Sequence, residues 1–440
     1  DRYSDPDTAY KNNLRFYINQ TREKGAIPVL FTSIIRRKFG EDGKLIDTHG
    51  RYISACKEVA AEMKVVCIDL NNSTETLVNN LGDEKSKELF MWVAPGTCPA
   101  IPDGRKDDTH LKVKGARIIA GMAVDSIEKK IPKLAPYIRR YDYVVAQDGS
   151  GDFFTLQKAI DAVPAFSKRP TTIYIRNGVY KEKVTVPGNR NNIHIIGEDV
   201  DKVILTYDDY ASKKNAFGDN IGTSGSSSFF VYGNGFTAEN VTFENSSGPV
   251  GQAVALFVAG DKCVFKNCKM KGFQDTLYTY GENSRQYYEN CYIEGTTDFI
   301  FGKSTAWFEN CTIHSKQNSY ITAAATPENV TYGYVFNKCR LTADDGVEKV
   351  YLGRPWRPYA AVLFTKCEMG KHIRPEGWHN WGKATNEKTA RYCEYKNKGE
   401  GSNTQGRVAW SHQLNRKEAS RYSIKQVLGG NDGWNPQEKN

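Results

Sequence analysis

The sequence predicts two unlike parts: an all-β right-handed parallel β-helix (a solenoid) over residues 139–440, preceded by a partial α/β segment over residues 1–138. In the larger part, short aromatic-rich segments recur every 20 to 28 residues, which is typical of stacked coils. The 440 residues include 38 Gly, 25 Tyr and 20 Phe, which favours many short strands and turns. In the smaller part, helical and strand patterns alternate, as they do in α/β proteins.

The first segment begins with apolar residues at helical spacing from Asp5 to Lys24, followed by an apolar run from Ala26 to Ser33. A second helical pattern, from Tyr52 to Met63, leads into the run KVVCIDL. Continuous apolar runs of this length suit parallel strands that helices cover on both faces. Prolines and basic residues then end the pattern, and we expect the boundary near Ile138.

Asp107 and His110 form an Asp-x-x-His motif just before a predicted helix. A carboxylate that fixes the imidazole tautomer is the base half of a nucleophilic triad, although an Asp that caps a helix beside a loop His gives the same motif. With its flanks, the motif resembles the last block of the SGNH, or GDSL-type, esterases, particularly those that deacetylate pectic polysaccharides. Those enzymes carry a Gly-Asp-Ser nucleophile near their N-terminus, and nothing before Lys24 supplies it. The resemblance therefore implies the visible part or remnant of a polysaccharide acetylesterase, with an incomplete second site.

The repeat of the larger part is a short aromatic strand closed by Asn or Lys. Its copies are VTFEN, CVFKNC, QYYENC, AWFENC, YVFNKC and VLFTKC, closing at Asn245, Asn267, Asn290, Asn310, Lys338 and Lys366. Single coils cannot bury an apolar face, so we expect them to stack with strands about 4.8 Å apart. The five cysteines of the repeat should then form a column of buried thiols rather than disulfides, and the Asn amides should pair with backbone groups at the bend. FTLQKAIDAVPAF predicts a short helix that covers the open N-terminal end.

Two acids occupy the same phase of this repeat. Asp275 follows Asn267 by eight residues, and Asp298 follows Asn290 by eight residues. Stacking would place the two carboxyl groups roughly 5 Å apart, so that one holds a proton while the other stays charged. Such a pair combines an acid with a nucleophile, but a similar separation also describes a retaining glycosidase. The spacing alone leaves open whether an ester or a glycosidic bond is cleaved.

Further polar and aromatic groups accompany the acids. Gln252 and Gln274 each stand seven residues after a repeat asparagine; such an amide ladder either staples two coils or donates hydrogen bonds to an oxyanion. In the LGRPW segment, Arg354 is suited to keep Asp298 ionised and Trp356 to stack on a sugar ring. A structural salt bridge and a packed indole are the alternative interpretation.

Five motifs resemble those of the pectin methylesterases in order and approximate spacing: GVYKEKV (178–184), GQAVAL (251–256), GFQDTLY (272–278), DFIFG (298–302) and LGRPW (352–356). The likeness runs from about Tyr143 to Pro436 and includes the closing GGNDGWNP. It implies a parallel β-helix that hydrolyses the C6 methyl esters of homogalacturonan, or pectin. A pectin lyase or hydrolase of the same architecture and a non-catalytic pectin-binding module are the alternatives, and the five motifs with intact acids favour the esterase.

The same resemblance implies roles for individual residues. Asp298 would be the nucleophile, Asp275 the acid and base, Gln252 and Gln274 the oxyanion donors, and Arg354 the orienting cation. Four aromatic residues match positions of the substrate cleft: Trp356, Tyr278, Phe301 and Trp378. The resemblance implies no cofactor and no metal.

The charge and hydropathy of the chain bound its partners. The net charge of +9 is spread out, without a block of five basic residues, so we expect a polyanionic substrate and no nucleic acid. No apolar stretch approaches the roughly 18 residues of a membrane span, so none is predicted. The polymeric substrate and the resemblance imply a secreted, periplasmic or cell-surface protein, although no signal segment is visible in the chain.

Overall fold

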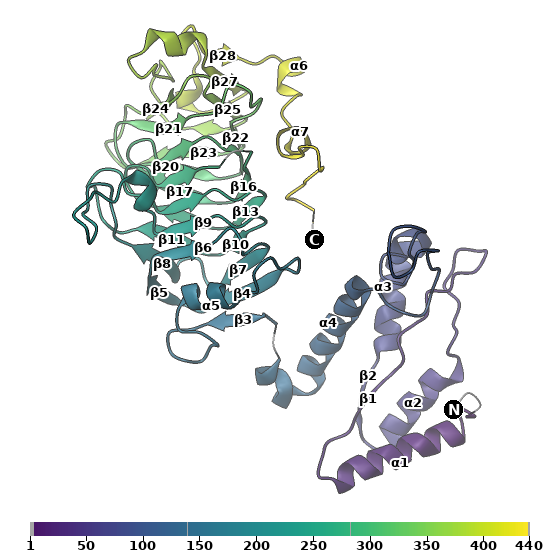
Figure 1. Ribbon diagram of the computed structural model, residues 1–440. Coiled ribbons are helices and arrows are strands. Elements are labelled where there is room, and N and C mark those ends of the chain that lie inside the picture. Colours follow the sequence, from purple (N-terminus) through teal and green to yellow (C-terminus); the bar gives the residue numbers. More distant parts are fainter. Residues whose placement is uncertain (1–3, 139, 282, 439–440) are drawn as a thin grey trace. The chain divides into compact units, whose positions relative to one another are not determined.

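Figure 1 shows the structure, a computed structural model that describes residues 4–138, 140–281 and 283–438. The chain forms two compact units, Asp1–Arg140 and Tyr141–Asn440. Among the described residues, no helix combines the length and the apolar character needed to cross a membrane.

The first unit has the predicted alternation of helices and strands. Its elements are α1 (Ala9–Glu23), β1 (Val29–Phe31), α2 (Arg51–Glu62), β2 (Val66–Ile68), α3 (Leu70–Ser86), α4 (Val113–Lys130) and the 3-10 helix η1 (Pro132–Tyr137). β1 and β2 pair in parallel, with Val29 opposite Val66. The expectation that helices cover β1 on both faces is wrong, because Phe31 is 43% exposed at the open edge of this sheet, which has two strands in the described residues.

The second unit is a parallel β-helix, as predicted, and its described strands form three sheets. The eleven-stranded sheet contains, in spatial order, β28 (His412–Gln413), β27 (Arg391–Tyr395), β25 (Ala361–Thr365), β22 (Tyr334–Asn337), β19 (Thr305–Glu309), β16 (Arg285–Glu289), β13 (Cys263–Lys266), β10 (Thr237–Glu239), β7 (Ile193–Gly197), β4 (Thr171–Ile175) and β3 (Tyr143–Val145). The eight-stranded sheet contains β26 (Glu368–Met369), β23 (Arg340–Ala343), β20 (Thr312–Ser315), β17 (Tyr292–Gly295), β14 (Lys269–Lys271), β11 (Thr242–Asn245), β8 (Val203–Tyr207) and β5 (Gly178–Lys181). The seven-stranded sheet contains β24 (Tyr351–Pro355), β21 (Tyr320–Ala324), β18 (Ile300–Gly302), β15 (Leu277–Thr279), β12 (Leu256–Val258), β9 (Phe229–Val231) and β6 (Val184–Val186).

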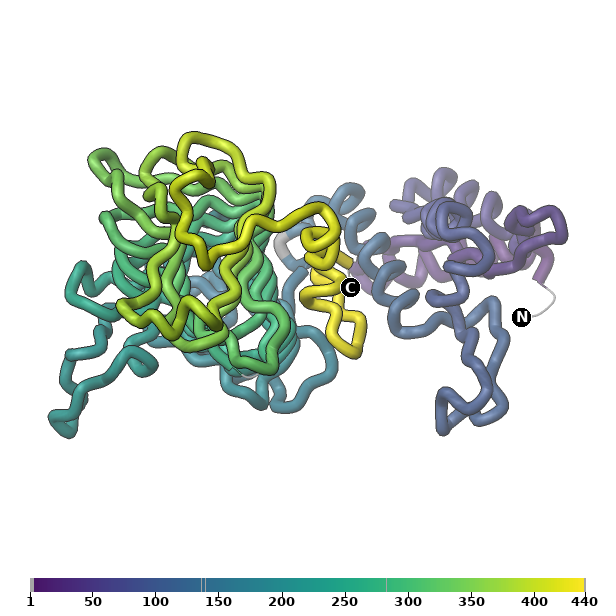
Figure 2. The backbone as a smooth tube through the Cα atoms, turned by 90° about the horizontal axis from the view of Figure 1, so that it is seen from above, coloured from purple at the N-terminus to yellow at the C-terminus, as the bar shows by residue number. Residues whose placement is uncertain are grey.

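Equivalent side chains stack along the interior of the solenoid, whose coils overlie one another in Figure 2. Phe265, Tyr288, Phe308, Phe336 and Phe364 form a ladder with ring centroids 4.4 to 4.9 Å apart. Each such aromatic pair contributes about 0.5–1.5 kcal/mol beyond burial. The five repeat cysteines are buried free thiols, which confirms the predicted column: Cys268, Cys291, Cys311, Cys339 and Cys367.

One residue per coil turns the chain from the eleven-stranded sheet into the eight-stranded sheet. In seven successive coils it has a positive φ, and we call this set the turn column: Asn240, Asn267, Asn290, Asn310, Lys338, Lys366 and Lys396. Asn enters this left-handed region more readily than other residues that carry a side chain. Between two of these coils the amides pair with each other rather than with backbone, since Asn310 Nδ2 donates to Asn290 Oδ1 at 2.6 Å.

Asn245 does not belong to the turn column, contrary to the sequence prediction. It ends β11 in the eight-stranded sheet, and the equivalent of Asn267 is Asn240. Its buried Nδ2 donates instead to the carbonyl oxygens of Asp209, Ser226 and Val254. VTFEN has the same strand pattern as the other copies of the repeat, but it lies in the next sheet along the coil.

Helices cover the first coil and part of the outside of the solenoid. α5 (Leu156–Ala162) packs against β3 and β6, with Leu156, Ala159 and Ile160 buried, as predicted for a cover of the first coil. The C-terminal segment carries α6 (Arg416–Ala419) and α7 (Ile424–Leu428) and runs back along the outside of the coils (Figure 1). The remaining 3-10 helices are η2 (Thr223–Gly225), η3 (Ala384–Lys388) and η4 (Glu400–Ser402).

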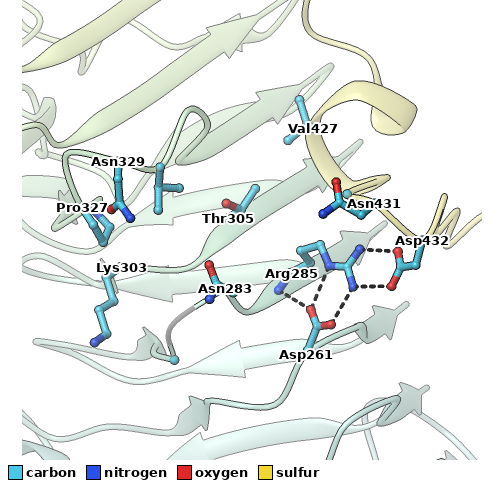
Figure 3. A pocket seen from close by; sticks show the side chains of 13 residues that line it. Asp261, Asn283, Arg285, Lys303, Thr305, Pro327, Asn329, Val427, Asn431 and Asp432 are labelled. Carbon is cyan, nitrogen blue, oxygen red and sulfur yellow. Dashed lines mark hydrogen bonds and ion pairs between the residues drawn. The ribbon is translucent and has the colours of Figure 1, made fainter.

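Arg285 anchors this C-terminal segment. Figure 3 shows its guanidinium between the carboxylates of Asp261 and Asp432, with Nη2–O distances of 2.6 and 3.0 Å. The hollow beside it measures about 590 Å³. Arg285 and both acids are paired with one another. This hollow is therefore a weaker candidate for a catalytic site than the smaller hollow that contains Asp275 and Asp298.

Candidate active site

Two acids stand side by side on the outer face of the seven-stranded sheet. Asp275 lies two residues before β15 and Asp298 two residues before β18, and the pairing of Leu277 with Ile300 puts the acids in register. Both have left-handed backbone, with φ of 67° and 50°. A residue held in a sparsely populated conformation in two successive coils is a feature often found at functional sites.

Burial and charge separate the two carboxyl groups. Asp275 is 7% and Asp298 5% exposed. Burial, then the neighbouring charge of Asp298, raises the pKa of Asp275 well above its usual range. Burial also raises the pKa of Asp298, but hydrogen bonds from Arg354 and its positive charge oppose that rise. The arrangement therefore favours a proton on Asp275 and a negative charge on Asp298.

Arg354, on β24, holds Asp298 through both carboxylate oxygens. Its Nε donates to Oδ1 at 3.0 Å and its Nη2 to Oδ2 at 2.6 Å. The guanidinium carbon lies 3.9 Å from the ring centroid of Tyr320 and 3.8 Å from that of Trp381. A two-point ion pair contacted by two aromatic rings fixes the orientation of the carboxylate.

Gln252 and Gln274 form the predicted ladder. They face each other in a parallel bridge between neighbouring coils, and both line the hollow that contains the acids. The equal spacing of the two amides from Asn245 and Asn267 does not correspond to equal positions in the coils, because Asn245 lies outside the turn column. Ten residues separate β11 from β12, and five separate β14 from β15, so the coils have different lengths. Their register at this point restores the pair.

Aromatic side chains form the walls of the hollow, which measures about 380 Å³. Tyr278 and Phe301 stack with centroids 4.1 Å apart, and Trp356 packs against both rings. The hollow is lined by Thr223, Ser224, Gln252, Gln274, Asp275, Tyr278, Asp298, Phe301, Ala323, Arg354, Trp356 and Trp381. The predicted acids, amides, arginine and three of the four predicted aromatics thus come together.

Trp378 is the predicted site residue that lies elsewhere. It is 1% exposed and packs inside the solenoid, with its ring 4.3 Å from that of Tyr392 and 5.9 Å from that of Phe364. The segment after β26 lies one coil beyond β24, and in it Trp378 pairs with Gly353 and fills the interior. Trp381, three residues later and with φ of 62°, lines the hollow instead.

Five residues near the acids were missed by sequence reasoning: Thr223, Ser224, Tyr320, Ala323 and Trp381. Thr223 and Ser224 arrive on η2, within a long loop between β8 and β9 that follows no repeat. The contact of Tyr320 with Arg354 could have been sought in the register, because Tyr320 lies one coil beyond Asp298 and its carbonyl accepts the Asp298 amide hydrogen.

The Asp107 and His110 pair of the first unit joins an exposed imidazole to a carboxyl group that is 12% exposed and also pairs with Arg105 at 2.9 Å. His110 Nδ1 and Asp107 Oδ2 are 2.8 Å apart, and the His110 side chain is 70% exposed. Backbone N–H groups of His110 and Thr109 donate to Asp107 and hold the pKa of that carboxyl well below its usual range. Among the residues that the structure describes, no hydroxyl or thiol hydrogen-bonds to His110 Nε2. The motif is therefore a dyad without a nucleophile in contact.

A family model described as Pectinesterase matches residues 142–431. The chain belongs to the pectinesterase family. The matched range falls within the solenoid and confirms the resemblance seen in the five motifs. Pectinesterases are carboxylic ester hydrolases. Two stacked carboxyl groups are compatible with cleavage of either an ester or a glycosidic bond, and membership of this family indicates the ester.

Pectinesterase relatives cover the same part of the chain. Pectinesterase 31 of Arabidopsis thaliana is 43% identical over 286 residues, which are 63% of this chain and 89% of that protein. The solved pectin methylesterase from carrot is 35% identical with a TM-score of 0.62, covering 67% of this chain and 94% of its own. A probable pectinesterase/pectinesterase inhibitor of Brassica napus is 38% identical over 64% of this chain, which spans only 50% of that longer protein.

Proposed function

We propose that residues 141–440 hydrolyse the C6 methyl esters of homogalacturonan and release methanol. The observation that carries the proposal is Asp298, held through both carboxylate oxygens by Arg354, beside Asp275, whose pKa is raised by burial and by the charge of Asp298. Family membership supplies the class of bond, and the names of the relatives supply pectin as the substrate. Because such a polysaccharide is a cell-wall polymer, the proposed place of action is outside the cytoplasm.

In the first half of the proposed reaction, an oxygen of Asp298 attacks the ester carbonyl carbon. The carbonyl oxygen becomes an oxyanion, and the amides of Gln252 and Gln274 are the proposed donors to it. The carbon–methoxy bond then breaks, and the leaving methoxide takes the proton of Asp275 and departs as methanol. Asp298 is left joined to the galacturonyl group as an anhydride.

In the second half of the proposed reaction, Asp275 acts as the base, because it lost its proton in the first half. Asp275, now ionised, accepts a proton from water while the water oxygen attacks the galacturonyl carbon. The anhydride bond breaks and leaves its electron pair on Asp298, whose restored carboxylate is again held by Arg354. The product is a galacturonate unit. Tyr278, Phe301, Trp356 and Trp381 supply the aromatic surface on which we propose that sugar rings stack.

Incubation with highly methylated pectin tests the proposal. We expect methanol without shortening of the polymer and without unsaturated ends. Absence of methanol at every pH from 5 to 9 would contradict it, and shortened chains would point to a glycosidic-bond enzyme. The acetylesterase resemblance of residues 1–138 remains a prediction.

A further inference from the structure

A basic groove lies on the solenoid away from the two acids, at the bend between the eleven-stranded and eight-stranded sheets. We define it by four cations on three successive coils: Lys338, Arg340, Lys366 and Lys398. Its volume is about 530 Å³, and Asn310, Thr312 and Glu368 also line it. The only acid of this lining is Glu368, so the groove carries a net positive charge.

The residue type of the turn column changes from Asn to Lys where the column borders this groove. Four coils place Asn in the left-handed position, and the next three place Lys there: Lys338, Lys366 and Lys396. Lys has no particular ability to occupy this conformation, whereas Asn does. In addition, stacked coils bring like charges to neighbouring positions about 4.8 Å apart in the backbone, where they repel. Backbone preference does not explain three lysines here, and repulsion between neighbouring coils disfavours them.

The acids near the groove neutralise only part of its charge. Lys338 pairs with Glu309 at 3.2 Å, and Lys398 pairs with Glu368 at 3.3 Å. Within the described part of the chain, Arg340 and Lys366 have no ion pair, and both are exposed. The groove therefore presents at least two uncompensated cations beside the side chains of Asn310 and Thr312, which can hydrogen-bond to hydroxyl groups.

We propose that the basic groove binds de-esterified polyuronate, the polyanionic product of the reaction, at a second site separate from the acid pair. The proposal rests on the proposed function for the identity of the polyanion. Each ester that is hydrolysed adds one carboxylate to the polymer, so the groove would favour product chain over methylated substrate. No aromatic side chain lines the groove, which disfavours single-stranded nucleic acid, because that ligand needs stacking platforms.

The test measures binding of fully de-esterified polygalacturonate at low salt, in an Asp298→Ala background that prevents turnover. The groove variant is Lys338→Asn with Lys366→Asn, which restores the residue that the preceding coils use at the same bend and should fold normally. We expect its dissociation constant to rise about fivefold, since exposed ion pairs are individually weak. The matched control, Lys158→Gln with Lys168→Asn, removes the same charge from exposed positions of the first coils and should stay within about twofold.

Two results would overturn the proposal: equal affinity of the groove and control variants, or the same fivefold loss for a single-stranded RNA homopolymer, which would indicate a general polyanion site. If the groove variant proves unstable, Arg340→Gln with Lys398→Gln replaces it. Methanol release by the wild-type chain is followed separately. A wild type that releases no methanol refutes the proposed function, whereas unaltered polygalacturonate binding by both groove variants refutes the groove.

Discussion

Each unit of this chain holds an aspartate next to a second titratable group, yet the two pairs have opposite electrostatics. In the solenoid, Asp275 and Asp298 are buried, and the pKa of each is raised. In the first unit, Asp107 accepts backbone N–H groups at the surface beside His110, and its pKa is lowered. The difference teaches that adjacency alone does not prepare a carboxyl group for acid catalysis. In the solenoid pair, burial raises both pKa values and the cation of Arg354 opposes the rise only at Asp298. At Asp107, which also pairs with Arg105 at 2.9 Å, the backbone N–H groups outweigh burial and lower the pKa.

Removing the proposed nucleophile should give the largest effect. We expect Asp298→Ala to lower the rate of methanol release from methylated pectin by at least about 10³-fold, because no other described carboxylate is held by Arg354. Asp107→Ala, the matched change in the pair of the first unit, should leave that rate within about twofold. Substantial activity in Asp298→Ala, or an equal loss of activity in Asp107→Ala, would contradict the assignment of catalysis to the solenoid pair.

Loss of the arginine should make the solenoid pair more like two ordinary buried acids. In Arg354→Gln the pKa of Asp298 should rise, because burial then acts without the opposing cation, and the acid limb of the profile of kcat/KM against pH should move to higher pH. We expect kcat to fall by roughly 10²-fold. Arg374→Gln serves as the control, since Arg374 pairs with Glu376 and does not contact the acids. An unmoved acid limb would contradict the assigned role of Arg354.

The pH dependence of stability should show the smallest effect, and the two pairs should respond with opposite signs. The raised pKa of Asp275 means that ionising this acid destabilises the folded protein, so the penalty grows as pH rises above the ordinary Asp range. Asp275→Asn removes it and should raise Tm by roughly 2 °C or more at pH 8, with a smaller gain near pH 4. Asp107 has a lowered pKa, so its carboxylate stabilises above the ordinary Asp range, and Asp107→Asn should instead lower stability slightly at neutral pH. Thermal unfolding of both variants from pH 4 to 8 checks the opposite signs; parallel curves would refute them.

Most of the solenoid could be predicted from the sequence, because residues that are one coil length apart in the chain become neighbours when the coils stack. Asp275 and Asp298 are 23 residues apart, and the coil that separates them has the same length, so the interval was sufficient. The same reasoning misplaced Asn245, because identical strand patterns occur in different sheets of one coil. Register within a coil depends on turn lengths, which the strand pattern does not reveal.

The aromatic residues show a second limit. Trp378 and Trp381 lie three residues apart, and a left-handed turn at Trp381 separates a core position from a cleft position. No periodicity marks that turn, since the segment between β26 and β27 contains no regular strand. The long loop that carries Thr223 and Ser224 follows no repeat for the same reason. Residues outside the repeating coils therefore had to be located in the structure.

Trapping the acyl-enzyme tests the central claim most directly. Methylated oligogalacturonate is turned over with hydroxylamine present, and the protein is digested and mapped by mass spectrometry. Hydroxylamine attacks an anhydride at either carbonyl carbon, so we predict a hydroxamate at Asp298 that appears only when substrate is added, together with some galacturonate hydroxamate. A hydroxamate at Asp275 instead of Asp298, or methanol release without any hydroxamate on protein or sugar, would contradict the account.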